Sequence, residues 1–194
     1  MIRYSTTTVL LLLAAFIIQQ FLPAFTALHD SRILLVQLTF LCCAVTVGMP
    51  TMLLLAFIGG FLWDAQSALG PHSGDPEVYK VQVESMRFGY SILLFGAMGF
   101  LMQGIQPFFK RGMWHISAVL SGIAVFLYLA VEYASIKFVR GEFLFSQTTI
   151  YKMVYTSVLT MLLSPFIFWV LFRVAKKCKH SIDPEAVRRR RGLA

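Results

Sequence analysis

Residues 50–70 of the chain read PTMLLLAFIGGFLWDAQSALG, and this stretch decides the fold. It begins with a proline, which suits the first turn of a helix. An almost unbroken apolar run follows and stops at Gly70-Pro71. At about 1.5 Å per residue, a helix from Pro50 to Leu69 is roughly 30 Å long, which matches the hydrocarbon core of a bilayer. The segment therefore predicts a transmembrane helix, with Asp64 below the membrane surface near its end.

Composition extends this conclusion to the whole chain. Of its 194 residues, 58% are hydrophobic and 13% are charged, and the mean hydropathy is +0.73. A soluble domain typically has about 25% charged residues, so this chain cannot cover a globular surface with polar groups. These values exclude an ordinary soluble enzyme, a disordered protein and a disulfide scaffold. The apolar runs are continuous rather than alternating, which excludes an outer-membrane barrel.

The sequence contains six apolar runs separated by short polar breaks. The expected helices cover residues 8–22, 33–47, 50–69, 86–109, 114–138 and 149–172. A signal peptide is the competing interpretation of the first run, but no small-x-small cleavage site follows it. We therefore expect an all-α membrane protein, with a single bundle of six transmembrane helices over residues 1–175. A basic tail over residues 176–194 completes the chain.

The charges are distributed unevenly between the two sides of such a bundle. Six crossings place eleven basic and two acidic residues on one side, and six basic and seven acidic residues on the other. The positive-inside rule then predicts that both termini are cytoplasmic. The tail arginines are Arg188, Arg189, Arg190 and Arg191. They either attract anionic lipid or only hold the C-terminus inside, and both interpretations stay open.

No catalytic or metal-binding pattern emerges from the residues. The four histidines, His29, His72, His115 and His180, lie in separate segments, and no phosphate-loop, zinc or nucleophile motif is present. We therefore expect no enzymatic activity, no cofactor and no metal. The basic residues gather at segment ends rather than on a folded surface, so we also expect no nucleic-acid partner.

Two acidic residues are expected inside the membrane. Asp64 and Glu132 lie near the outer ends of the third and fifth expected helices, where an ionised carboxylate needs a partner, water or a proton. Arg87, at the outer start of the fourth helix, is the basic residue whose expected depth in the membrane is closest to that of these two acids. We expect Asp64, Arg87 and Glu132 to form a structural polar cluster, with a ligand or proton site as the alternative. Gln103 and Gln106 are expected to make hydrogen bonds between helices.

Small residues four positions apart mark one face of the fifth expected helix. Ser117 pairs with Ser121 in this way, and Ala118 pairs with Gly122. Small residues let two helices approach closely in a membrane. These four residues are the candidate surface for a partner helix, and internal packing of the bundle is the alternative.

The third helix also carries a family resemblance. The run Gly59-Gly60-Phe61-Leu62-Trp63-Asp64, followed by Gly70, resembles the third helix of the rod shape-determining protein MreD family. Residues 94–112, with their basic turn, and the six-helix plan are also similar to that family. The resemblance covers roughly residues 5–175, and its distinctive positions are Gly59, Gly60, Asp64 and Gly70.

The resemblance implies a non-enzymatic scaffold of the bacterial inner membrane. MreD proteins belong to the cell-elongation (rod) complex, where they bind the single-span protein MreC. There they support cell-wall peptidoglycan synthesis by RodA and its transpeptidase, and thereby cell shape. The family is also similar in fold to the substrate-binding subunits of energy-coupling-factor vitamin transporters, which is the alternative function. Those subunits often carry an Ala-xxx-Ala face on the first helix, whereas here Ala15 is followed four residues later by Gln19.

Overall fold

The computed structural model describes residues 2–23, 31–68, 88–110, 114–140 and 147–178. These residues form six helices and confirm the all-α architecture. The helices are α1 (Ile2–Phe21), α2 (Leu35–Thr46), α3 (Met49–Ala68), α4 (Tyr90–Lys110), α5 (Trp114–Arg140) and α6 (Gln147–Lys177). The third helix has almost the predicted bounds, while α1 and α6 extend several residues beyond the apolar runs.

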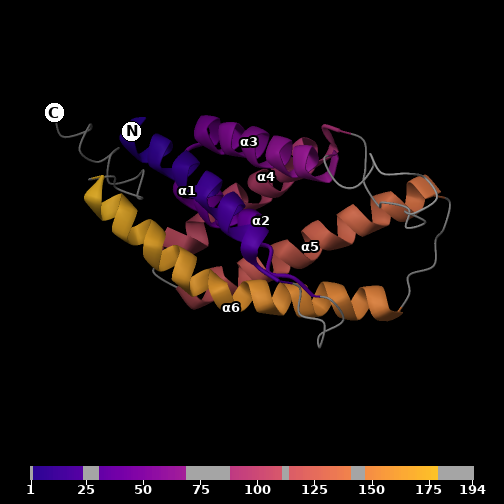
Figure 1. Cartoon of the computed structure of the whole chain (residues 1–194). Coiled ribbons are helices and arrows are strands. Elements are labelled where there is room, and N and C mark those ends of the chain that lie inside the picture. The colour runs from indigo at the N-terminus through magenta and orange to yellow at the C-terminus, as the bar shows by residue number, and fades with distance from the viewer. Residues whose placement is uncertain (1, 24–30, 69–87, 111–113, 141–146, 179–194) are drawn as a thin grey trace.

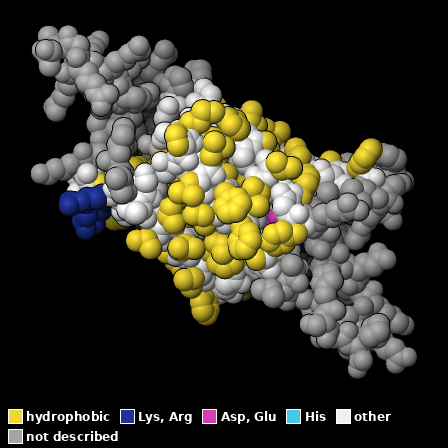
Figure 2. Space-filling model, turned by 90° about the horizontal axis from the view of Figure 1, so that it is seen from above, with side chains coloured by type: hydrophobic (Ala, Val, Ile, Leu, Met, Phe, Trp, Pro, Cys, Tyr) yellow, Lys and Arg dark blue, Asp and Glu magenta, His cyan; other side chains and the backbone are white. Residues whose placement is uncertain are grey.

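Four of these helices, α1, α3, α5 and α6, are long and apolar enough to cross a membrane. The chain is therefore a multi-pass membrane protein. Figure 2 shows hydrophobic side chains over the middle of one face and basic side chains at its edge, as a lipid-facing surface requires. Helix α2 is shorter than the apolar run 33–47, because its twelve residues reach only about 18 Å.

The short helix α2 lies at the centre of the bundle (Figure 1). All twelve of its residues are buried, and it contacts each of the other five helices. A helix that is apolar all round belongs in a protein core or in a membrane. The contacts of α2 with all five other helices place it in the core of the bundle.

The first turn of α2 is buried, so its backbone amides need partners from other helices. The side-chain oxygen of Gln19, on α1, accepts a hydrogen bond of 2.8 Å from the Val36 amide. The hydroxyl of Thr160, on α6, accepts a bond of 3.3 Å from the Leu34 amide. Two helices that are far apart in sequence thus complete the start of α2.

The last turn of α2 is completed by α4. Gln103 Nε2 donates to the Ala44 carbonyl at 3.2 Å and to the Val47 carbonyl at 3.0 Å. Gln106 Nε2 donates to the Val45 carbonyl at 2.8 Å. The prediction that both glutamines bond between helices is confirmed, and their acceptors are the carbonyls that a helix end leaves unpaired.

Helices α1 and α3 run side by side in the same direction. Ser5 and Thr51 share a hydrogen bond of 3.2 Å near their starts, and Gln66 donates to Gln20 at 3.0 Å near their ends. The start of α1 also meets the end of α6, where the Thr7 hydroxyl lies 3.8 Å from the Cys178 sulfur. The start of α1 and the end of α6 therefore lie on one side of the molecule (Figure 1).

Candidate functional site

The contact between α3 and α4 is built on the two adjacent glycines of the third helix. A Cβ atom on Gly60 would lie 2.5 Å from the Ile92 Cα atom, and a Cβ on Gly59 would lie 3.0 Å from the Phe95 ring. Backbone cannot move aside as a flexible side chain can. Gly60 therefore allows α3 and α4 to touch backbone to backbone.

Asp64 lies one turn after Gly60 and is buried, with 7% of its surface exposed. Its Oδ2 atom accepts a hydrogen bond of 2.6 Å from the backbone amide of Gly89, next to the start of α4. A carboxylate is favoured at a helix start because of the unpaired amides and the helix dipole. Gly89 has a φ of +98°, which favours glycine. The expected burial of Asp64 is confirmed. Its expected partner Arg87 lies outside the described residues, and so does Gly70.

Four buried or half-buried polar side chains gather between α2, α3 and α5, and we name them the interior polar cluster: Gln37, Asp64, Tyr128 and Glu132. Tyr128 lies beside Gln37 and within electrostatic range of Glu132 and Asp64. Glu132 is also within electrostatic range of Asp64, and the Trp63 side chain lies near the Glu132 carboxylate. The two predicted acids thus lie within electrostatic range of each other.

Gln37 and Tyr128 are members of the cluster that the sequence analysis missed. Both side chains are almost fully buried, at 1% and 2% exposure. The signal for Gln37 was a polar residue within the apolar run 33–47, where lipid or protein offers an amide few partners. Tyr128 gave no comparable signal, because tyrosine is common in apolar runs and at membrane interfaces.

The small residues of α5 face α6. Ser121 is fully buried, and its hydroxyl donates to the Ser164 hydroxyl at 2.8 Å. A Cβ on Gly122 would lie 2.8 Å from Met161 Cγ, and Ala118 is 9% exposed. Ala118, Ser121 and Gly122 therefore pack inside the bundle, as the alternative interpretation expects. Ser121 in particular exposes no surface to a partner. The side chain of Ser117 lies outside the described residues.

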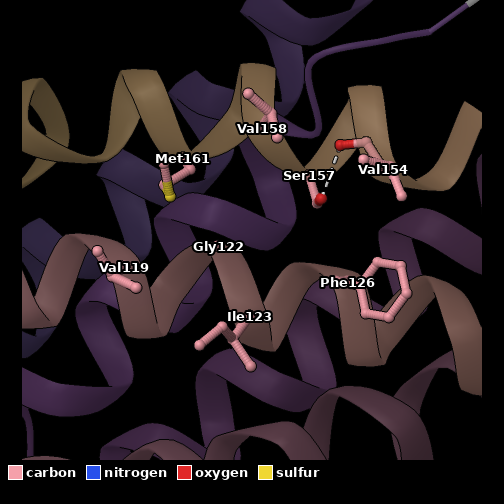
Figure 3. Close-up of a pocket in the computed structure, with 8 residues that line it drawn as sticks. All are labelled: Val119, Gly122, Ile123, Phe126, Val154, Ser157, Val158 and Met161. Carbon is pink, nitrogen blue, oxygen red and sulfur yellow. Dashed lines mark hydrogen bonds between the residues drawn. The ribbon is translucent and has the colours of Figure 1, made fainter. Parts of the chain in front are cut away.

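An open apolar groove runs along the same interface, with a volume of about 250 Å³. Figure 3 shows α5 side chains on one wall and α6 side chains on the other, with Met161 over Gly122. The lining residues are Val119, Gly122, Ile123, Phe126, Val154, Ser157, Val158 and Met161. The Ser157 hydroxyl does not add polarity, because it donates to the Val154 carbonyl at 2.8 Å. Of the predicted partner surface, only Gly122 lines this groove.

The end of α6 carries the described part of the basic segment. Arg173, Lys176 and Lys177 are exposed, and the Arg173 guanidinium lies 4.3 Å from the centre of the Trp169 ring. Such a pair suits a membrane interface, where an aromatic ring and a cation both meet headgroups. The four tail arginines lie outside the described residues.

The described residues contain no group of three or more His, Cys, Asp or Glu side chains that could hold a metal ion. Comparisons with protein-family models, curated proteins and solved structures found no match to this chain. The function must therefore be inferred from the site and from the sequence resemblance.

Proposed function

We propose that this protein is a non-enzymatic scaffold of the bacterial inner membrane, of the kind that the MreD family represents. Its partner in this proposal is an MreC-like single-span membrane protein. Through that partner it supports peptidoglycan synthesis by RodA and its transpeptidase, and so cell shape. The resemblance of Gly59, Gly60 and Asp64 to the family motif supports this assignment, because these residues define the α3–α4 contact.

The groove between α5 and α6 is the observation that carries the proposal. Its two walls expose apolar side chains toward the membrane, with Val119 and Ile123 each 50% exposed and Val158 45% exposed. Helices associate in lipid through close van der Waals packing, and an open groove lined by apolar side chains of two helices provides a surface for it. We assign this groove to the transmembrane helix of the partner.

Filling the groove tests this assignment. Ile123→Trp places a large ring at the groove mouth, and we expect it to abolish co-purification with the MreC-like partner while the melting temperature is maintained. The matched control is Ile17→Trp on α1, where the native side chain is 59% exposed and away from the groove. This control should retain the partner.

Equal partner binding by the two variants would contradict the groove assignment. At the level of function, depletion of the protein should abolish the normal cell shape. Normal shape combined with a vitamin-uptake defect, and a vitamin bound in the purified protein, would instead favour the transporter alternative.

The orientation in the membrane belongs to the same proposal. The +8 net charge resides mainly in the segments at the two chain ends and the 110–111 turn, and α1 and α6 meet at Thr7 and Cys178. Both termini are therefore assigned to the cytoplasm, where exposed Lys176 and Lys177 face anionic lipid. A Cys178→Ser/His180→Cys variant should resist an impermeant thiol reagent in intact cells. Labelling of the new cysteine by the reagent from outside the cell would contradict the assigned orientation.

A further inference from the structure

Four buried side-chain polar atoms have no hydrogen-bond partner among the described residues, and three of them belong to the interior polar cluster. These three are the Oε1 and Nε2 atoms of Gln37 and the hydroxyl oxygen of Tyr128, and the fourth is the Thr39 hydroxyl oxygen. The side chains of Gln37 and Tyr128 lie beside each other, but no aligned hydrogen bond joins them. Buried polar groups in native proteins are almost always paired with protein, water or a bound ligand. The orphaned atoms therefore indicate that something other than the protein completes this part of the core.

The same place carries an excess of negative charge. Asp64 and Glu132 are the only acidic residues among those that the structure describes, and they lie within electrostatic range of each other and of Tyr128. The Gly89 amide, which donates to Asp64, and the Trp63 side chain near Glu132 are both neutral. In the described part of the chain, no lysine, arginine or histidine side chain is placed against either carboxylate. Neutral donors orient a carboxylate but do not cancel its charge.

We propose that the interior polar cluster binds a small monovalent cation, with the Glu132 carboxylate, the Gln37 amide oxygen and the Tyr128 hydroxyl oxygen as its ligands. These are hard oxygen donors, which suit a hard cation such as Na⁺. A single positive charge also offsets one of the two carboxylate charges in a region of low dielectric. A divalent ion is a poorer fit, because the described residues provide no group of three ionisable ligands. The site is independent of the groove between α5 and α6 and of the partner assigned to it.

Thermal unfolding of the purified full-length protein in detergent tests the site. We expect the melting temperature to rise by a few degrees, saturably, when choline chloride is replaced by NaCl at constant ionic strength and pH, because a ligand that binds only the folded state stabilises it. Glu132→Gln and Tyr128→Phe keep the shape of their side chains and should lose this sodium-dependent rise. Gln20→Leu, which changes an exposed amide on α1, is the control and should retain it.

A melting temperature that is the same in sodium, potassium and choline would overturn the proposal and leave water or a proton as the occupant. A sodium effect that survives both Glu132→Gln and Tyr128→Phe would place the cation elsewhere, and it would equally overturn the assignment. Should one variant fail to fold, the other and the wild-type titration still decide the outcome. Partner binding is unaffected by either result, so the scaffold proposal is tested separately.

Discussion

The side-chain oxygen of Gln19 accepts a 2.8 Å hydrogen bond from the backbone amide of Val36, and so joins the last turns of α1 to the first turn of α2. Gln19 occupies the position, four residues after Ala15, at which the sequence departs from the Ala-xxx-Ala face of vitamin-transporter subunits. The structure gives this departure a reason. A small residue here would leave the start of a buried helix without one of its acceptors.

The first prediction concerns this bond. Gln19→Leu should lower the free energy of unfolding by about 1–3 kcal/mol, since it leaves the Val36 amide unpaired in an apolar environment. The neighbouring Gln20→Leu is the matched control, because Gln20 bonds Gln66 at the exposed surface and should have a much smaller effect. Unfolding in detergent followed by circular dichroism compares the two. Equal losses would show that the α2 start is satisfied in another way.

A second prediction addresses the α3–α4 crossing. Gly60→Ala should destabilise the protein by about 1–3 kcal/mol, since its methyl group would collide with the Ile92 backbone. Gly96→Ala is the control, because nothing described lies within 4 Å of its added Cβ; alanine is also the better helix former. Melting temperatures of the two variants should therefore move in opposite directions. An unchanged melting temperature in Gly60→Ala would mean that the two helices can move apart at little cost in free energy.

A third prediction separates the hydrogen bond of Asp64 from its charge. Asp64→Ala leaves the Gly89 amide without its acceptor and should cost about 1–3 kcal/mol. Asp64→Asn keeps an acceptor oxygen at the same place, so it should retain most of the stability. Chemical denaturation of both variants distinguishes the two contributions. A loss as large in Asp64→Asn as in Asp64→Ala would assign the effect to the negative charge instead.

The fourth prediction follows from the position of Gly122 under Met161. Gly122→Leu should weaken the α5–α6 contact and lower the melting temperature, because even a Cβ atom would overlap Met161. Met161→Ala in the same chain removes the obstructing side chain, so the double variant should recover part of the loss. Additive losses in the double-mutant cycle would show that Gly122 and Met161 do not interact. Partner binding is better examined with Ile123→Trp, which leaves this contact intact.

Much of the fold could be predicted from the apolar runs, because lipid requires long continuous helices. The run from Pro50 to Leu69 gave α3 almost to the residue, since a proline begins it and Gly70-Pro71 follows it. The same argument predicted a second helix over residues 33–47, whereas α2 covers only residues 35–46. Hydropathy shows that a segment prefers apolar surroundings, but it cannot distinguish lipid from the interior of a helical bundle. Helix α2 lies in the interior of the bundle.

The candidate site was predictable only where polar residues interrupt apolar runs. Asp64 and Glu132 stood out because each is costly in a membrane, and they lie within electrostatic range of each other. The partners on other helices could not be predicted, because tertiary packing brings the Gly89 amide to Asp64 and Gln37 to Tyr128. One sequence does not reveal such packing. The small residues of α5 indicated a close helix contact correctly, but not which helix makes it.

The place of α2 has a consequence for the order in which the chain is assembled during synthesis. The Leu34 amide at the start of α2 is satisfied by Thr160, which lies 126 residues further along the chain. The ribosome therefore completes α2 long before α6 leaves it, and the carbonyls at the other end of α2 likewise await Gln103 and Gln106 on α4. Until then, insertion machinery or water must hold these groups. The most deeply buried helix is thus among the first to be made and the last to be fully enclosed.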